Sequence, residues 1–422
     1  MAKRENPDVV HLPRAAIAAA AERFPTPFFL YEEARLRARC ARFRDVFAER
    51  FPGFAPLFAV KANPNPDLLE IIFAEGFGAD ASSEAEAWLA ETLGAGGMYT
   101  GNYTTEDELR EVLGRGLLLN LDDVSLLPVL ERVGVPEFLS FRINPGIARG
   151  SMKSLVMAGP DAKYGVPHEE AAEAYRRAQK LGVRRFGIHA MTGSNVRDHR
   201  YFPAVAERLL TIAADIRDAT GIAVEWLNIG GGFGVPYRPD ETSLDLERAA
   251  DGIRRAFDRV CRKRDLDPPT LMAEPGRWIL ADCGWLVGRV HVVKEGYKTF
   301  AGLDCGMNDL PRPAIYDAYH HLTVLGPSGR KKGGRKRRIN VVGRLCENND
   351  QFARDRLLPP VKPGDLVVIH NAGAHAYAMG HNYNNRLRSA EILHTANGKL
   401  RRIRRAETVE DLVRTTRLGD GP

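Results

Sequence analysis

The sequence has few cysteines and no long apolar run, and both absences narrow the class of protein. Five cysteines stand among 422 residues and none forms a CxxC pair, which argues against a disulfide framework or a structural zinc site and favours a reducing, cytoplasmic location. No run of about 18 apolar residues occurs, so no transmembrane span is predicted. The apolar residues 15–21 are bounded by Arg14 and Glu22 and predict a short helix rather than a secretory signal.

Neither basic nor acidic residues are in excess over most of the chain. The net charge of +6 reflects 60 basic and 54 acidic residues, and residues 330–338, RKKGGRKRR, hold seven basic residues and no acid. This run is short, interrupted by glycine and without aromatic residues, so we expect a solvated loop, with a polyanion site as the less favoured alternative. We therefore expect no nucleic-acid or membrane partner, and we interpret residues 326–338 as a local insertion.

The remaining composition is that of a globular protein, with 44% hydrophobic residues, 40 glycines and 26 prolines. From residue 56 to 274, short runs typical of strands alternate with amphipathic segments typical of helices. Eight β-then-α units predict parallel strands with right-handed crossovers, and hence a (β/α)₈ TIM-type barrel in the α/β class. The expected strands are residues 56–60, 78–81, 98–101, 117–121, 138–143, 186–190, 225–229 and 270–274.

After about residue 285 the pattern changes to β-rich runs without long helices, which predicts a C-terminal all-β domain. We expect a barrel over residues 30–284 and a β-domain over residues 285–422 that includes part of residues 1–29. The expected strands of this second domain are residues 285–297, 298–306, 337–346, 365–371 and 388–395.

Polar residues follow the expected barrel strands, at the ends where such barrels carry their functional groups. Lys61 ends the first strand, where desolvation would lower its pKa and favour a Schiff base with an aldehyde; a surface lysine is the alternative. His189 after the sixth strand could stack on a heteroaromatic ring or be a hydrogen-bonded core residue. Glu274 after the eighth strand needs a cation, either Arg277 or a protonated pyridine nitrogen.

The run NIGGGFG contains Gly230, Gly231 and Gly232, which would let backbone N–H groups approach an anion closely. A tight loop without a ligand is the plainer interpretation of such a run taken alone. A lysine, a flat histidine, a glycine turn and an acid at one rim together predict a pyridoxal phosphate site.

Longer motifs resemble those of one enzyme family. VKANPNP, GADASSEAE, NIGGGFG, EPGRW, CGMNDLPRPAIYDAYHH, LCENNDQFARD and HNAGAHAYAMGHNYNNR occur in this order within residues 25–415. They resemble the fold type III pyridoxal phosphate decarboxylases, which have an alanine racemase-like barrel, and among them the diaminopimelate decarboxylases. The resemblance implies decarboxylation of meso-2,6-diaminopimelate at its D-centre, giving L-lysine and CO₂. It further implies a homodimer whose β-domain contributes to the partner's active site.

The resemblance assigns roles to residues of both expected domains. Lys61 would hold the cofactor aldehyde, His189 would stack on the cofactor ring, and Glu274 would keep the ring nitrogen protonated. Cys346, entering from the second subunit, would reprotonate the substrate's Cα. Further cofactor contacts are implied for Asp80, Ser194, Gly230, Gly231, Gly232, Gly276, Arg277 and His375, and substrate contacts for Arg277, Arg312, Tyr316 and Glu347.

Three segments depart from the family's pattern, and two other functions remain open. The HIGSQ-type segment reads HAMTGSN here, the CES motif reads CEN with Asn348 and Asn349, and the tyrosine of the GAY motif is His375. A sister decarboxylase of D-ornithine, D-lysine or a polyamine precursor would share the cofactor site and differ at the distal groups. A non-catalytic carrier would bind pyridoxal phosphate without releasing CO₂, but the presence of both Lys61 and Cys346 argues against it.

Overall fold

The computed structural model describes residues 5–146 and 158–418, and the chain divides into two compact units. The barrel unit comprises Arg37–Val235 and Leu244–Ile279, and the β unit comprises Met1–Leu36, Pro236–Ser243 and Leu280–Pro422. The segment Pro236–Ser243, which we predicted from the sequence to be part of the barrel, belongs to the β unit. Its Pro236 and Pro239 carbonyls accept hydrogen bonds from Asn371 and from the backbone of Asn6, both of which lie in that unit.

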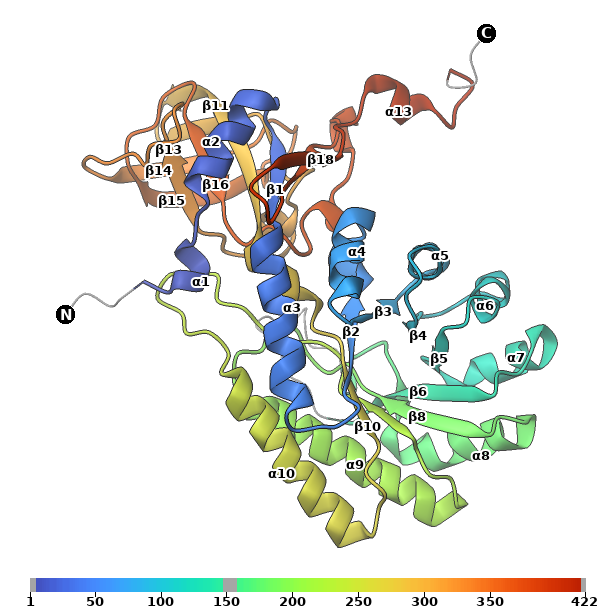
Figure 1. Cartoon of the computed structure of the whole chain (residues 1–422). Coiled ribbons are helices and arrows are strands. Elements are labelled where there is room, and N and C mark those ends of the chain that lie inside the picture. The colour runs from blue at the N-terminus through green and yellow to red at the C-terminus, as the bar shows by residue number, and fades with distance from the viewer. Residues whose placement is uncertain (1–4, 147–157, 419–422) are drawn as a thin grey trace. The chain divides into compact units, whose positions relative to one another are not determined.

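A closed ring of eight parallel strands forms the centre of the barrel unit (Figure 1). Pairing of the last strand with the first, and of the fourth with the fifth, completes the ring. The (β/α)₈ barrel and all eight strands expected from the sequence are confirmed, and one two-residue strand, β7 (Val166–Pro167), adds to the edge of β6. The barrel strands are β2 (Ala55–Ala59), β3 (Gly78–Ala81), β4 (Gly97–Tyr99), β5 (Leu118–Leu121), β6 (Phe138–Asn144), β8 (Arg185–His189), β9 (Trp226–Asn228) and β10 (Thr270–Ala273).

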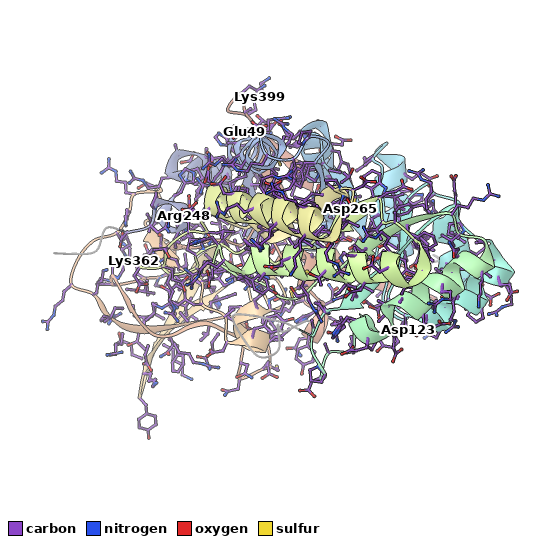
Figure 2. The ribbon with its side chains drawn as sticks, turned by 90° about the horizontal axis from the view of Figure 1, so that it is seen from below. Glu49, Asp123, Arg248, Asp265, Lys362 and Lys399 are labelled. Atoms are coloured by element: carbon purple, nitrogen blue, oxygen red, sulfur yellow. The ribbon has the colours of Figure 1, made fainter. Side chains whose placement is uncertain are left out.

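The helices of the barrel unit begin where the sequence carries start signals. Ser83 and Thr105 are N-caps whose side chains accept hydrogen bonds from the backbone N–H groups of Glu86 and Glu108, as expected for these residue types. In Figure 2, Arg248 and Asp265 mark the two ends of the long helix α10. The helices are α3 (Glu33–Ala48), α4 (Pro66–Ala74), α5 (Glu84–Thr92), α6 (Glu106–Leu113), α7 (Leu127–Val133), α8 (Ala171–Leu181), α9 (Tyr201–Thr220), α10 (Leu246–Arg264) and α11 (Gly276–Leu280).

An aromatic cluster connects the segment after β9 to two of these helices. Phe233, three residues after Gly230, is stacked on Phe202 of α9 with ring centroids 4.1 Å apart. Phe43 of α3 meets the same ring edge-on, with centroids 5.0 Å apart. All three rings are fully buried, so the chain immediately after the glycine turn is fixed by packing rather than by the turn alone.

The β unit is built on one nine-stranded sheet. Its first strand, β1, pairs antiparallel with β11 and parallel with β17, so residues near the N-terminus lie in the middle of the sheet. The mostly β architecture is confirmed, but three strands, β13, β15 and β18, were not predicted. The strands are β1 (Phe28–Glu32), β11 (Gly284–Glu295), β12 (Thr299–Leu303), β13 (Leu322–Leu325), β14 (Arg337–Val342), β15 (Gln351–Leu358), β16 (Leu366–Ile369), β17 (Ala390–His394) and β18 (Leu400–Arg404), with short helices α1 (Pro7–Val10), α2 (Arg14–Arg23), α12 (Arg312–Tyr316) and α13 (Val409–Val413).

The five cysteines are free, and four of them are buried while Cys346 is exposed. Within residues 5–146 and 158–418, no helix is both long enough and apolar enough to cross a lipid bilayer. The same described part of the chain contains no group of three or more His, Cys, Asp or Glu side chains arranged to hold a metal ion.

Replacing Phe233 with alanine should destabilise the barrel unit. Phe233→Ala removes a fully buried ring and leaves a cavity between α3 and α9, which costs about 3 to 5 kcal/mol in the free energy of unfolding. Urea denaturation followed by circular dichroism measures the loss. The exposed Trp88 provides a control, because Trp88→Ala should change the free energy of unfolding by less than about 0.5 kcal/mol. Equal effects of the two substitutions would contradict the assigned packing role.

Candidate active site

Four polar residues of the predicted site stand at one end of the barrel strands. Lys61 lies in the 3₁₀ turn Val60–Ala62 directly after β2, and Asp80 is in the last half of β3. His189 is the last residue of β8, and Glu274 follows β10. Because the strands are parallel, their carboxyl ends meet at one rim, which is the functional face of this fold.

Lys61 and Asp80 form an ion pair at this rim. The Lys61 Nζ atom lies 2.7 Å from Asp80 Oδ2 and donates to Ser82 Oγ at 3.3 Å. The Asp80 side chain is fully buried, whereas 45% of the Lys61 side chain is exposed. The other carboxylate oxygen, Asp80 Oδ1, is buried without a hydrogen-bond partner. The Lys61 side chain is therefore partly exposed while its partner is held inside the barrel.

The pKa of Lys61 differs from the expectation drawn from sequence. Desolvation lowers this pKa, but the Asp80 and Glu274 carboxylates and the hydrogen bond to Asp80 outweigh it, and the pKa lies above its ordinary value. The predicted fall is wrong because the sequence did not reveal an acid within hydrogen-bond distance. Burial and the nearby Glu274 charge also raise the pKa of Asp80, which makes Asp80 a better acceptor for the Lys61 proton than an ordinary aspartate.

His189 and Glu274 form a second buried pair. The His189 Nε2 atom lies 3.2 Å from Glu274 Oε1, and the same oxygen accepts a hydrogen bond of 2.7 Å from Asn228 Nδ2. On the other side of the imidazole, Nδ1 lies 3.2 Å from Asn120 Nδ2. Burial raises the pKa of the Glu274 carboxyl, but His189, Lys61 and Asn228 outweigh it and hold that pKa at about 2. Glu274 is therefore ionised at neutral pH.

The glycine turn has no room for side chains. Gly230 and Gly232 have φ angles of +67° and +86°, which favour glycine. A Cβ atom on Gly230, Gly231 or Gly232 would lie 2.5, 2.6 or 2.7 Å from a backbone oxygen of Ala190, Glu274 or Gly193. The turn thus presents bare backbone next to Glu274, as a cradle for an anion requires.

Ser194, Gly276 and Arg277 also belong to the barrel unit. Arg277 Nη2 donates to Ser194 Oγ at 3.4 Å, which connects the EPGR segment to the HAMTGSN segment. Gly276 begins α11, and a Cβ atom there would lie 2.9 Å from Ala59 Cβ and 3.1 Å from Ala62 Cβ, on either side of Lys61 in sequence. These contacts fix the EPGR segment closely against the turn that carries Lys61.

The remaining predicted residues, Arg312, Tyr316, Cys346, Glu347 and His375, lie in the β unit. Arg312 is buried, its Nη1 lies 2.9 Å from His320 Nε2, and its guanidinium lies 4.6 Å from the ring centroid of Tyr237. Tyr316 follows at the end of the same short helix, α12. His375 has a φ angle of +55°, which is uncommon for a residue with a side chain. The structure thus gives Arg312 a fixed orientation through His320 and Tyr237.

Cys346 and Glu347 lie on an exposed loop that is tied down by a buried acid. The Asp350 carboxylate accepts hydrogen bonds from the backbone N–H groups of Met307 at 2.6 Å and Leu345 at 2.8 Å. The Cys346 N–H donates to Asn384 Oδ1 at 2.7 Å. The loop therefore holds the one exposed thiol of the chain in a defined backbone conformation.

Sequence reasoning missed three residues of this rim. Asn120 and Asn228 orient His189 and Glu274, and Arg142, which is buried, hydrogen-bonds Asn102 Oδ1 and the Met191 carbonyl. Each is a polar residue inside an otherwise apolar strand. That signal was present in LLLNL, EWLNI and FLSFRI, because a polar residue in a barrel strand needs a partner.

The barrel residues fit pyridoxal phosphate. A lysine with a partly exposed side chain suits its aldehyde, an acid that is ionised at neutral pH suits a protonated ring nitrogen, and a turn closed to side chains suits a phosphate. The unpaired Asp80 Oδ1 adds an acceptor that a bound group can satisfy.

Removing the acid beside Lys61 should shift the titration of its amine to lower pH. In Asp80→Asn the carboxylate that raises the Lys61 pKa is lost while desolvation, which lowers it, remains. Labelling Lys61 with an amine-reactive reagent across a pH series, read by peptide mass spectrometry, measures the midpoint. Ser82→Ala, which removes only a neutral contact, should leave the midpoint in place. A midpoint that is the same in Asp80→Asn and wild type would exclude Asp80 as the main cause.

Comparison with known proteins agrees with this site. Residues 33–281 match the family described as pyridoxal-dependent decarboxylase, pyridoxal binding domain. The chain is 38% identical to a diaminopimelate decarboxylase from Methanothermobacter thermautotrophicus over 93% of its own length and 92% of the relative's. It is 40% identical to the protein TabA of Pseudomonas amygdali pv. tabaci, covering 92% and 90% of the two chains.

A solved structure supports the same assignment. Diaminopimelate decarboxylase from Helicobacter pylori complexed with L-lysine is 29% identical, with a TM-score of 0.85 over 94% of this chain and 98% of that one. The match to the family covers most of the barrel unit and includes Lys61, Asp80, His189 and Glu274. The chain belongs to the pyridoxal-dependent decarboxylases.

Proposed function

We propose that this protein removes CO₂ from the D-centre of meso-2,6-diaminopimelate and releases L-lysine. The observation that carries the proposal is the 38% identity to a diaminopimelate decarboxylase, which extends over 93% of the chain and so includes both units. L-lysine is the ligand of the similar Helicobacter pylori structure, and it is the product that this reaction yields.

The residues that would hold pyridoxal phosphate are those of the barrel rim. Lys61, Asp80, His189 and Glu274 would bind the reactive part, and Ser194, Gly230, Gly231, Gly232, Gly276 and Arg277 would bind the phosphate end, with His375 from the β unit. When bound, the cofactor supplies an electron sink for the carbanion that remains after CO₂ leaves. Glu274 supports that role because its carboxylate stays ionised and can hold a proton on a ring nitrogen.

In the Lys61–Asp80 pair, Asp80 would take up the proton that the Lys61 amine must lose. Lys61 is an ammonium in this pair, and an amine must lose its proton before it can act as a nucleophile. Asp80 Oδ2, at 2.7 Å, is the acceptor in reach, and burial raises its pKa toward that task. The imidazole of His189 lies between two partners, Asn120 and Glu274, which fix its orientation at the rim.

Substrate selection is assigned to four residues that carry charge or a hydroxyl group. Arg277, Arg312 and Tyr316 would bind the carboxylate of the distal centre, since guanidinium groups bind carboxylates in a bidentate manner. Glu347 would receive the distal ammonium group. Holding that end fixes which carboxylate of the substrate is placed for cleavage.

Cys346 is proposed as the acid that protonates Cα, acting from the second subunit of a homodimer. Its exposure and the tie of its loop to Asp350 support this role, because a proton donor that serves a partner must be both accessible and positioned. The five free thiols support a reducing, cytoplasmic location.

A sister decarboxylase is the second candidate. Asn348, Asn349 and His375 stand where the resemblance leads us to expect other side chains, and they fall among the groups assigned to the distal end and the phosphate. D-Lysine and D-ornithine lack the distal carboxylate, so a preference for them would leave Arg312 without its proposed ligand.

Product analysis with meso-diaminopimelate and D-lysine side by side tests the substrate. We expect one L-lysine per CO₂ from the former and slow turnover of the latter. Arg312→Ala should lower kcat/KM for meso-diaminopimelate by about a hundredfold, while D-lysine turnover changes by less than about threefold, since only the former has a carboxylate to lose. Tyr316→Phe, a smaller change on the same helix, provides a variant that keeps the fold. Equal losses for both substrates would exclude the distal-carboxylate contact.

Mixing two inactive variants tests the shared site. Lys61→Ala and Cys346→Ala should each abolish most turnover alone. After subunit exchange, a heterodimer would contain one site with both wild-type groups, and about a quarter of wild-type activity should return. Sites complete within one chain would give no recovery in the mixture, and full activity of Cys346→Ala alone would remove this thiol from the mechanism.

A further inference from the structure

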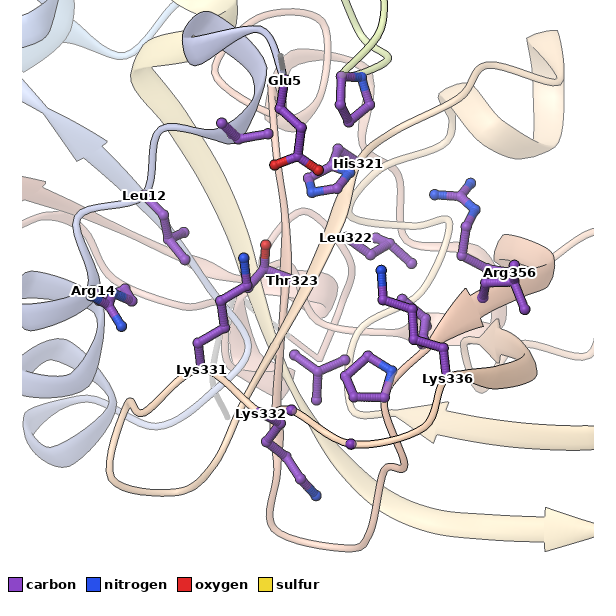
Figure 3. Close-up of a pocket in the computed structure, with 18 of the residues that line it drawn as sticks. Glu5, Leu12, Arg14, His321, Leu322, Thr323, Lys331, Lys332, Lys336 and Arg356 are labelled. Atoms are coloured by element: carbon purple, nitrogen blue, oxygen red, sulfur yellow. The ribbon is translucent and has the colours of Figure 1, made fainter. Parts of the chain in front are cut away.

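The β unit contains a pocket that the proposed reaction does not use. Its volume is about 540 Å³, which is in the range of small-ligand pockets. It is formed by the segment before α2, by β13 and β15, and by the basic loop, residues 326–338. Figure 3 shows the side chains that line it, including Lys331, Lys336 and Arg356.

Most of the charged residues in the lining are cations. Arg14, Lys331, Lys332, Lys336 and Arg356 line the pocket, and Glu5 is the one acid among the lining residues. Lys332 is neutralised by the fully buried Asp365, with Nζ 2.6 Å from Oδ2. Within residues 5–146 and 158–418, the other four cations form no ion pair with an acid. A concave surface with unneutralised positive charge concentrates the field and favours anions.

Arg356 is held in position by contacts that leave its charge uncompensated. Its Nη1 donates to the His320 carbonyl at 2.9 Å, and the guanidinium lies 4.0 Å from the centroid of the Tyr319 ring. Both contacts orient the group without an opposing negative charge. A preorganised cation of this kind gives a bound anion a fixed partner at little further cost in side-chain entropy.

Three of these cations act on one residue of the pocket, His321. Burial together with Arg356, Lys331 and Lys336 holds the pKa of His321 at about 4, so this imidazole is neutral at physiological pH. Side chains from β15 and from the basic loop therefore act on the same imidazole, although they are distant in sequence. A neutral imidazole there can donate a hydrogen bond to an anion.

The contacts of the Tyr319 ring favour a small polyanion over a nucleic acid as the ligand. Binding of single-stranded nucleic acid relies on aromatic faces for base stacking. The ring of Tyr319 already carries two guanidinium groups, Arg238 at 4.1 Å and Arg356 at 4.0 Å from its centroid. Lys331 and Lys336, in contrast, are exposed ammonium groups on a loop that contains Gly333 and Gly334, and such groups bind phosphate as point charges.

We propose that this pocket binds a small, multiply charged phosphate compound through Lys331, Lys336, Arg356 and Arg14. The source of the phosphates can be an inorganic polyphosphate or the phosphate chain of an organic metabolite. The basic loop, for which the sequence favoured a solvated surface, thereby becomes one wall of a binding site. None of these four cations is among the residues assigned to the proposed decarboxylation.

Calorimetric titration of the holoenzyme with tripolyphosphate at low salt tests the proposal. We expect saturable binding of one anion per chain, which weakens as ionic strength rises. The double substitution Lys331→Gln with Lys336→Gln should raise the Kd by about tenfold or more. Lys399→Gln, which removes an exposed lysine labelled in Figure 2 from the turn after β17, should leave the Kd unchanged.

Titrations with other anions distinguish an inorganic polyphosphate from an organic metabolite as the ligand. A nucleoside triphosphate that binds as tightly as tripolyphosphate supports recognition of the phosphate chain alone, and a tighter one supports an organic metabolite. Citrate that binds as tightly as tripolyphosphate would overturn the preference for phosphate. The His321 resonance should titrate at higher pH when the anion is bound, because added negative charge favours the imidazolium. No saturation, equal weakening by Lys399→Gln, or preferential binding of single-stranded DNA would each overturn the proposal.

Discussion

Two carboxylates buried at the same rim, Asp80 and Glu274, set the condition that the rest of the barrel site must meet. The Glu274 charge raises the cost of ionising Asp80, and burial raises the cost of ionising both acids. Lys61 compensates the first at 2.7 Å, and His189 and Asn228 compensate the second. Removing charge compensation from a buried acid is costly, so the burial of these two acids depends on the amine, the imidazole and the amide.

The same arrangement gives the two acids different properties. Glu274 has three partners that favour its charged form and its pKa is held at about 2, whereas Asp80 keeps one oxygen without a partner and its pKa is raised. One acid is thus a fixed negative charge, and the other accepts a proton more readily than an ordinary aspartate. Separation of two neighbouring carboxyl groups by environment is a general way to obtain two roles from one residue type.

Packing behind the rim supports this geometry. The glycine turn would collide with backbone oxygens if it carried any Cβ atom, and Phe233 holds its far end between α3 and α9. In the β unit, Asp350 fixes the loop of Cys346. Its buried carboxylate accepts hydrogen bonds from two backbone N–H groups, which hold a loop that has no secondary structure of its own.

The sequence by itself determined the fold class and the residues at strand ends, because strand and helix periodicity and the order of βα units are local properties of the chain. Lys61, Asp80, His189 and Glu274 could be selected from it since each stands where an apolar strand ends. The sequence did not predict β15 and β18, because their arginines interrupt the apolar pattern of a strand. Pairing with β14 and β17 forms these strands in the structure. Only the tertiary structure decided the direction of the Lys61 pKa shift, the roles of Asn120 and Asn228, and the gathering of Lys331, Lys336 and Arg356 around one pocket. Each of these depends on a distance between residues far apart in the chain, and the electrostatic energy of a pair is set by that distance and by its burial, neither of which a linear pattern contains.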